Sequence, residues 1–159
     1  MNNETIINKL KDGNKQYVKG GIIGDVSKNR RIDTYLNGQS PFALVITCSD
    51  SRVIPEVIFQ QGIGDLFVVR VAGNVVDEFV LGSIEYAIEH LNITFVVVLG
   101  HKNCGAVSSC LNHASGRYVN KLIERISQNI KKEKDYDKAI ELNSGMKMKI
   151  EIFFIFMLV

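Results

Sequence analysis

Three short runs of consecutive apolar residues constrain the fold of this chain more than any other feature. Residues 41–47 (PFALVIT), 65–71 (DLFVVRV) and 94–100 (TFVVVLG) are rich in β-branched side chains, and their apolar positions do not alternate with polar ones. Strands of this kind are usually covered on both faces, as in parallel sheets. Between the second and third runs, residues 77–91 have the apolar spacing of a helix, which Asp77 can cap. This order predicts an α/β fold with a mostly parallel central sheet flanked by helices.

The rest of the chain shows helical patterns. The apolar positions of the first twenty residues have near-helical spacing, which predicts an N-terminal helical arm that ends at Gly20 and Gly21. Residues 117–140 have the pattern of one or two amphipathic helices whose charges face solvent. At 159 residues, the chain has the size of a single domain.

The composition argues against several classes of protein. A net charge of +2, with Lys and Arg scattered along the chain, lacks the basic patch that nucleic acid binding requires. The apolar stretch IFFIFMLV has eight residues, whereas a membrane span needs about 20. The first residues lack the features of a secretory signal, so we expect a cytoplasmic protein that binds no membrane. Three cysteines, an odd number, fit reduced thiols or metal ligands better than a disulfide framework.

Reactive and charged side chains follow the first and third of the apolar runs. Cys48, Asp50 and Arg52 (in CSDSR) come after the first run, and His101 and Cys104 (in GHKNCG) come after the third. In parallel α/β sheets, ligands bind beyond the carboxyl ends of the strands. If these two strand ends are neighbours, the two thiols and the imidazole converge.

This set of side chains suits a catalytic zinc site. Two thiols and one imidazole are tetrahedral zinc ligands, and three protein ligands leave the fourth position open to a water that becomes a hydroxide nucleophile. Arg52 can hold the Asp50 carboxylate by two hydrogen bonds. Asp50 can then accept a hydrogen bond from the zinc-bound water or, once released, occupy the fourth zinc position. From the residues alone, small buried cysteines without a metal remain an open alternative.

The motifs, in their order, resemble those of the β-class carbonic anhydrases. The similarity runs from about Leu10 to Ala106 and continues weakly to about Asn143. The matching segments are LKDGNKQY, GQSPFALVITCSDSRVIPE, GDLFVVRVAGNV, GSIEYA and VVVLGHKNCGAV. The resemblance implies reversible hydration of carbon dioxide to bicarbonate and a proton by a zinc-bound hydroxide. It also implies one zinc ion per subunit and a homodimer or higher homo-oligomer.

The resemblance further implies a role for individual side chains. The implied zinc ligands are Cys48, His101 and Cys104. The implied catalytic pair is Asp50 and Arg52. The implied substrate-binding residues are Gln39, which hydrogen-bonds the substrate, Phe67 and Tyr86, which line a carbon dioxide pocket between paired subunits, and Gly105, a point of close backbone approach. The proton carrier is not identified, and His90 and His113 are candidates only by residue type.

The similarity ends before the chain does. Residues 1–143 form the predicted carbonic-anhydrase-like domain, and residues 144–159 form a divergent tail with strand propensity that can supply a substitute edge strand. Two alternative functions stay open. One is a hydrolase of carbon disulfide or carbonyl sulfide on the same scaffold, and the other is an inactive, truncated zinc-binding homologue.

Overall fold

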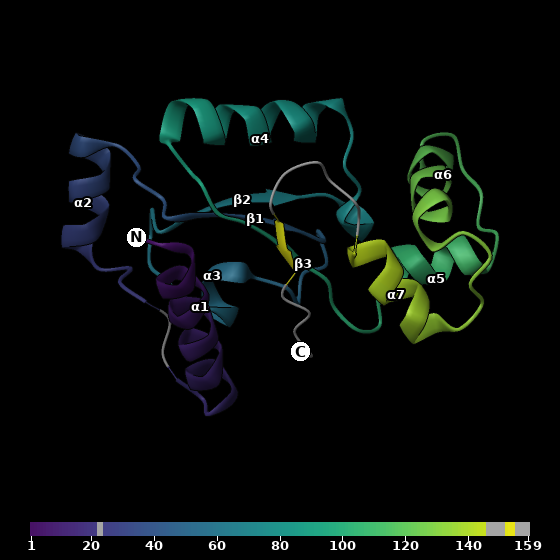
Figure 1. Ribbon diagram of the computed structural model, residues 1–159, viewed down its shortest axis with the longest axis horizontal. Coiled ribbons are helices and arrows are strands. Elements are labelled where there is room, and N and C mark those ends of the chain that lie inside the picture. The colour runs from purple at the N-terminus through teal and green to yellow at the C-terminus, as the bar shows by residue number, and fades with distance from the viewer. Residues whose placement is uncertain (22–23, 146–151, 155–159) are drawn as a thin grey trace.

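A parallel β-sheet forms the centre of the computed structural model, which describes residues 1–21, 24–145 and 152–154 (Figure 1). The strands of the described residues are β1 (Ala43–Thr47), β2 (Leu66–Arg70), β3 (Val96–Leu99) and β4 (Ile152–Phe154). Their order across the sheet is β2-β1-β3-β4, and each pair of neighbours is parallel. The predicted α/β class and mostly parallel sheet are therefore confirmed.

The register of the strands brings their carboxyl ends together. Thr47, the last residue of β1, lies opposite Arg70 of β2 and Leu99 of β3. The buried Thr47 hydroxyl also donates a hydrogen bond of 2.8 Å to the carbonyl oxygen of Leu99. The segments that follow the three strands consequently begin side by side at one edge of the sheet, where ligands of such sheets bind.

One face of the sheet is covered by α1 (Asn3–Val18) and the short α3 (Pro55–Ile58). Asn2 caps α1 by accepting the N–H of Thr5, and the apolar stripe of the helix buries Ile6 and Leu10 against the sheet. The helix α2 (Lys28–Asn37) buries no residue, and it lies away from the sheet at one end of the molecule (Figure 1).

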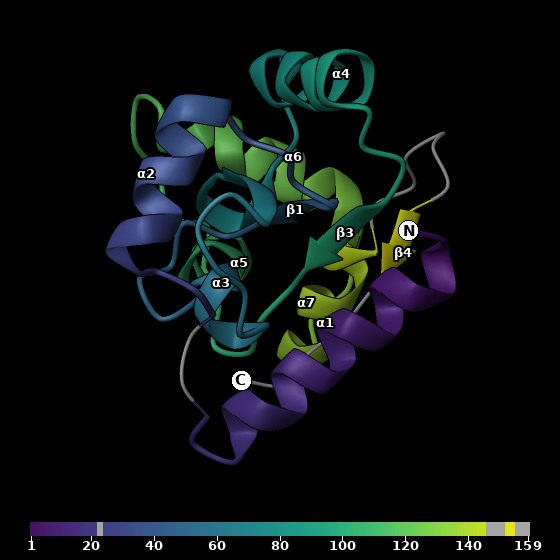
Figure 2. The same cartoon turned by 90° about the vertical axis from the view of Figure 1, so that its left-hand side faces the viewer.

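The opposite face is covered by α4 (Glu78–Leu91). Asp77 caps this helix by accepting the N–H groups of Phe79 and Val80, as the sequence predicts. Because side chains alternate along a strand, residues 44 and 46 of β1 pack under α4, whereas residues 43 and 45 pack under α1. Figure 2 shows α4 and α1 on opposite sides of the strands.

A third apolar cluster lies beyond the carboxyl ends of the strands. It is built from α5 (Gly105–Leu111), α6 (Val119–Ile130) and α7 (Tyr136–Ser144), which lie together in Figure 1. Cys48 and Cys104 belong to this cluster, so the edge of the sheet is closed by helices around both thiols.

Most of the expected elements are present. The three apolar runs form β1, β2 and β3, and residues 117–140 contribute to two helices, α6 and α7. Within the tail, residues 152–154 pair with β3 as β4, while residues 146–151 and 155–159 lie outside the described residues. No helix in the described ranges is long and apolar enough to cross a membrane.

Candidate metal centre

Cys48, His101 and Cys104 converge at the carboxyl edge of the sheet. Cys48 directly follows β1, His101 lies two residues after β3, and Cys104 is the N-cap of α5. Their potential ligand atoms all lie within 4.8 Å of one another. The three residues are 4%, 3% and 2% exposed, respectively, so the group is shielded from solvent. This cysteine–histidine cluster could hold a metal ion.

The orientation of His101 fits a metal ligand. Its Nδ1 atom lies 2.8 Å from the carbonyl oxygen of Lys102, and since that oxygen can only accept, Nδ1 carries the proton. In the neutral imidazole the Nε2 atom then carries the lone pair, and among the described residues it has no hydrogen-bond partner although it is buried. An unpaired buried polar atom is unfavourable. A cation bound between this nitrogen and the two sulfurs would satisfy it.

The two thiols differ in their electrostatic environment. A hydrogen bond from Cys104 lowers the pKa of Cys48 against the opposing effect of burial, and His101 and the N–H of Gly73 add to the lowering. The same hydrogen bond and burial raise the pKa of Cys104. The Gly73 N–H lies 3.2 Å from the Cys48 Sγ atom. These surroundings favour the thiolate form of Cys48, which is the form that binds metals.

Asp50 and Arg52 form the ion pair that the sequence predicts. Nε and Nη2 of Arg52 donate to the two carboxylate oxygens at 2.9 and 2.8 Å, and the Arg52 backbone N–H donates to Oδ1 at 3.0 Å. Hydrogen bonding from Arg52 holds the pKa of the Asp50 carboxyl well below its usual range. Oδ2 of Asp50 lies 4.0 Å from Nε2 of His101. An ionised carboxylate therefore lies at the edge of the cluster and is held by the arginine fork.

Arg70 stabilises the same loop from the end of β2. Its guanidinium donates to the carbonyl oxygens of Cys48 at 3.2 Å and Asp50 at 2.7 Å. The sequence analysis does not assign Arg70 a role. Its place as the last but one residue of the predicted strand 65–71, at the edge where the reactive residues gather, was a usable signal.

A second residue that sequence reasoning misses is Gly73, in the short 3-10 helix η1 (Ala72–Asn74). It has a φ of 67°, and a Cβ atom there would lie 2.8 Å from Cδ1 of Ile126. Only glycine combines this backbone conformation with this contact. The turn that it permits directs the Gly73 N–H at the Cys48 sulfur.

Gln39 lies away from the cluster within one chain. It is an exposed residue between α2 and β1, before the amino end of β1, whereas Cys48 follows the carboxyl end. The five residues of β1 separate these ends by about 16 Å. Gln39 therefore lies far from the cluster of its own chain, and its substrate contact stays a prediction.

The two aromatic residues predicted for the substrate pocket are neighbours. The ring centroids of Phe67 on β2 and Tyr86 on α4 are 6.2 Å apart. The ring centroids of Tyr86 and His90 are 5.2 Å apart. Gly105, the first residue of α5, has no atom of the described chain within 4 Å of the position that a Cβ would take. The close approach predicted there is therefore not made by any residue that the structure describes.

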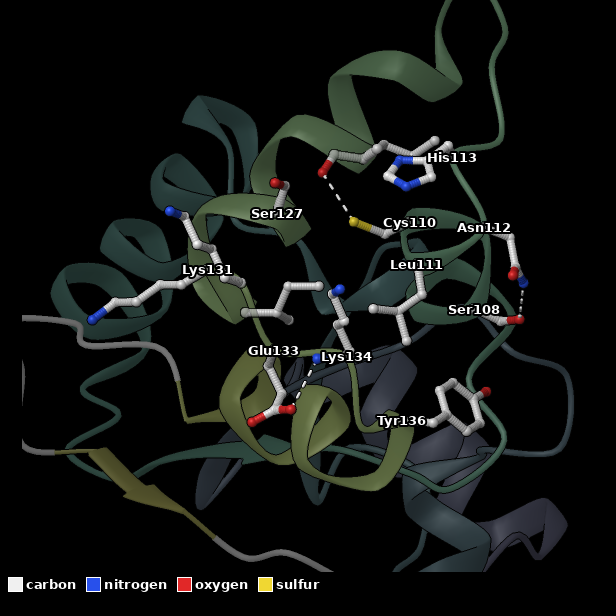
Figure 3. Close-up of a pocket in the computed structure, with 13 residues that line it drawn as sticks. Ser108, Cys110, Leu111, Asn112, His113, Ser127, Lys131, Glu133, Lys134 and Tyr136 are labelled. Carbon is white, nitrogen blue, oxygen red and sulfur yellow. Dashed lines mark hydrogen bonds between the residues drawn. The ribbon is translucent and has the colours of Figure 1, made fainter.

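The remaining cysteine lies in a different environment. Cys110 is buried and lines a cavity of about 660 Å³ between α5, α6 and the start of α7 (Figure 3). His113 also lines this cavity, whereas His90 lies in the last turn of α4. Neither histidine is thereby identified as a proton carrier.

Comparisons with known proteins agree on one family. A family model described as carbonic anhydrase matches residues 43–152. Carbonic anhydrase 2 of Mycobacterium tuberculosis is 44% identical over 126 residues, which cover 76% of this chain and 61% of the relative. The chain thus spans about three-fifths of the length of that relative.

Solved structures show the same similarity. A Coccomyxa β-carbonic anhydrase in complex with acetazolamide superposes with a TM-score of 0.62 at 30% identity, covering 73% of this chain and 59% of that one. A β-carbonic anhydrase of Aspergillus fumigatus gives a TM-score of 0.64 at 28% identity, covering 72% and 60%.

Proposed function

The chain belongs to the β-class carbonic anhydrase family, and from this premise we propose that it reversibly hydrates carbon dioxide to bicarbonate and a proton. The observation that carries the proposal is the cysteine–histidine cluster, with a buried Nε2 atom that has no hydrogen-bond partner among the described residues. The relatives named above are carbonic anhydrases, which favours this activity over the hydrolysis of carbon disulfide or carbonyl sulfide.

The cluster would hold one zinc ion per subunit through Cys48, His101 and Cys104. Two thiolates and a neutral imidazole are a zinc donor set, and three protein ligands are the number found in catalytic zinc sites. Zinc bound there would supply a Lewis acid that lowers the pKa of a water molecule at its open position. The chain contributes a buried setting and a histidine whose tautomer is fixed by the Lys102 carbonyl.

Asp50 would orient the reacting oxygen, and Arg52 would orient Asp50. While it is ionised, the carboxylate can only accept hydrogen bonds, so it selects an oxygen that still carries a proton. The Arg52 fork occupies both carboxylate oxygens and keeps Asp50 beside the cluster rather than on the metal. Released from Arg52, Asp50 could take the fourth metal position and close the site.

The substrate contacts would come from Gln39, Phe67, Tyr86 and Gly105. Carbon dioxide is small and apolar, so aromatic rings such as those of Phe67 and Tyr86 suit its pocket. The Gln39 amide can donate to a bicarbonate oxygen. The open space beside Gly105 leaves room for a bound molecule near the backbone.

A homodimer or a higher homo-oligomer would complete the site. Gln39 is exposed and lies beyond the far end of β1, so it can reach a cluster only on a second copy of the chain. Exposed apolar side chains on α2 and α4 support such an interface, among them Tyr35, Leu36, Phe79 and Tyr86.

We also propose that residues 1–143 are the catalytic domain and residues 144–159 a divergent tail that supplies an edge strand. The pairing of residues 152–154 with β3 supports the second part of this proposal. The cytoplasmic location remains a prediction from the sequence.

Stopped-flow measurement of carbon dioxide hydration by the zinc-loaded protein, from about pH 6.5 to 9, tests the proposed activity. We expect turnover that rises with pH and is abolished in Cys48→Ser. The zinc content of each sample should be measured in parallel. Bound zinc without turnover above the Cys48→Ser control would reject the proposed activity and favour the inactive homologue or, if carbonyl sulfide is hydrolysed, the alternative substrate.

A further inference from the structure

The helix α7 donates hydrogen bonds to two backbone carbonyls at the cluster, that of Gly73, whose N–H contacts Cys48, and that of Cys104. Asn143 is 1% exposed, and its Nδ2 atom donates to the carbonyl oxygen of Gly73 at 2.8 Å. Its Oδ1 atom accepts a hydrogen bond of 3.0 Å from Nδ2 of Asn129. The Asn143 amide is therefore held in one orientation by partners on both sides.

The two peptide groups of Gly73 link the fixed Asn143 amide to Cys48. The Gly73 carbonyl accepts from Asn143, and the Gly73 N–H donates to the Cys48 Sγ atom at 3.2 Å. The left-handed backbone at Gly73, with a φ of 67°, is uncommon and needs support from its surroundings. Asn143 provides such support, and so fixes the direction in which the N–H points at the sulfur.

Tyr136 makes the corresponding contact with Cys104. Its hydroxyl donates to the carbonyl oxygen of Cys104 at 2.8 Å. The same oxygen accepts the N–H of Ser108 at 3.0 Å, the first backbone bond of α5. The Tyr136 ring also lines the cavity between α5, α6 and α7 (Figure 3). The peptide group that follows the ligand is thus held both by its own helix and by α7.

We propose that Asn143 and Tyr136 are positioning residues, through which α7 fixes the backbone around the thiol ligands Cys48 and Cys104 for metal binding. Neither side chain touches the ligand atoms, and each acts through a carbonyl oxygen. Some residues orient the metal ligands without touching the metal. Replacing such a residue typically lowers metal affinity by about 10-fold to 100-fold. The proposal rests on the proposed zinc centre.

The test uses the full chain with Tyr136→Phe, which removes a single hydroxyl, and Asn143→Ala. Tyr118→Phe and Asn120→Ala are the matched controls. Tyr118 is exposed, and the hydrogen bond described for the Asn120 side chain is one that it accepts from the N–H of Gly116, away from the cluster. Zinc affinity is measured by competition with a chelator. The absorption bands of the cobalt-substituted protein report on the thiolate ligands directly, and a thermal melt reports on the fold.

We expect metal affinity to fall on the order of 10-fold in Tyr136→Phe and Asn143→Ala, with shifted cobalt–thiolate bands, while both controls match the wild type. Tyr136→Phe should melt at the same temperature as Tyr118→Phe. If Tyr136→Phe keeps its affinity within about twofold of its control and its spectrum is unchanged, the proposal is overturned, even if Asn143→Ala fails to fold. A wild-type chain without cobalt–thiolate bands would instead reject the zinc centre itself.

Discussion

The Nε2 atom of His101 links the chemistry of single residues to the metal centre. It is buried near the sulfurs of Cys48 and Cys104, and the described part of the chain gives it no hydrogen-bond partner. In a site without a metal, this nitrogen would be an uncompensated polar atom, which is unfavourable. This nitrogen and the sulfurs of Cys48 and Cys104 are instead close enough together to bind one metal ion.

The three cysteines allow a matched test of this arrangement. Cys48→Ser and Cys104→Ser should each reduce bound zinc from one ion per chain to a small fraction, because a hydroxyl is a much poorer zinc ligand than a thiolate. Cys110→Ser should keep its zinc, since Cys110 is buried outside the cluster. Atomic emission spectroscopy of the purified, dialysed proteins measures the zinc content per chain. Equal zinc in all three variants would contradict the assigned ligands.

The Asp50–Arg52 pair predicts a pH dependence of stability. The pKa of Asp50 is lowered in the folded protein, mainly by hydrogen bonds from Arg52, so the pair stabilises the fold above the ordinary aspartate pKa of about 4. This stabilisation is lost as the pH falls from there through the lowered folded value. Arg52→Ala should therefore be less stable than the wild type at neutral pH, and the difference should shrink below about pH 4.

Urea unfolding of both proteins, at a series of pH values from neutral to acidic, measures this difference. Lys15→Ala is a suitable control, because it removes an exposed ion pair with Asp12 that lies far from the cluster in sequence. A difference between wild type and Arg52→Ala that grows as the pH falls would contradict the assigned coupling.

At the scale of elements, a helix or strand could be predicted from the sequence where its own residues carry a clear pattern. The strands β1, β2 and β3 were predictable because strands buried on both faces are continuously apolar. No helix was predicted for α2, whose apolar residues Ile32, Tyr35 and Leu36 have helical spacing but are exposed in the single chain, nor for α3, which has only four residues. The helix predicted for the first twenty residues is α1, which ends at Val18 and packs on the sheet.

The candidate site divides in the same way. Cys48, His101 and Cys104 were predictable because reactive residue types directly follow buried strands. Tyr136 and Asn143 were not, since they act on residues 32 and 70 positions away in the chain. Their residue types alone carry no sign of a role at a metal site. The roles of Gln39, Phe67 and Tyr86 came from the family resemblance rather than from the spacing of residues.

The element η1 gives a prediction about stability. Gly73→Ala should destabilise the fold by roughly 1–3 kcal/mol, because alanine disfavours a φ of 67° and its Cβ would crowd Ile126. Gly82→Ala in the middle of α4 should instead stabilise it by about 0.5–1 kcal/mol, since nothing lies within 4 Å of the added carbon. Urea unfolding of both variants measures the two changes. A neutral Gly73→Ala would show that η1 does not need glycine.

At the scale of the whole molecule, one chain separates the parts that the proposed reaction needs together. The cysteine–histidine cluster lies at the carboxyl edge of the sheet, and Gln39 lies beyond the amino end of β1. Two copies related by a two-fold axis could each place Gln39 at the cluster of the other, because such interfaces are reciprocal. Dimerisation would then be a requirement for activity and not only for stability.

Complementation between two inactive chains tests this arrangement. Chains carrying Cys48→Ser and Gln39→Ala are coexpressed with different affinity tags, and mixed dimers are isolated by successive purification on both tags. If Gln39 acts across the interface, each mixed dimer has one site with both changes and one site with neither. The mixed dimers should therefore recover about half of the wild-type rate of carbon dioxide hydration, although each variant alone is impaired. If Gln39 acted within its own chain, no intact site would form, and the mixed dimers would be no more active than the mean of the two variants.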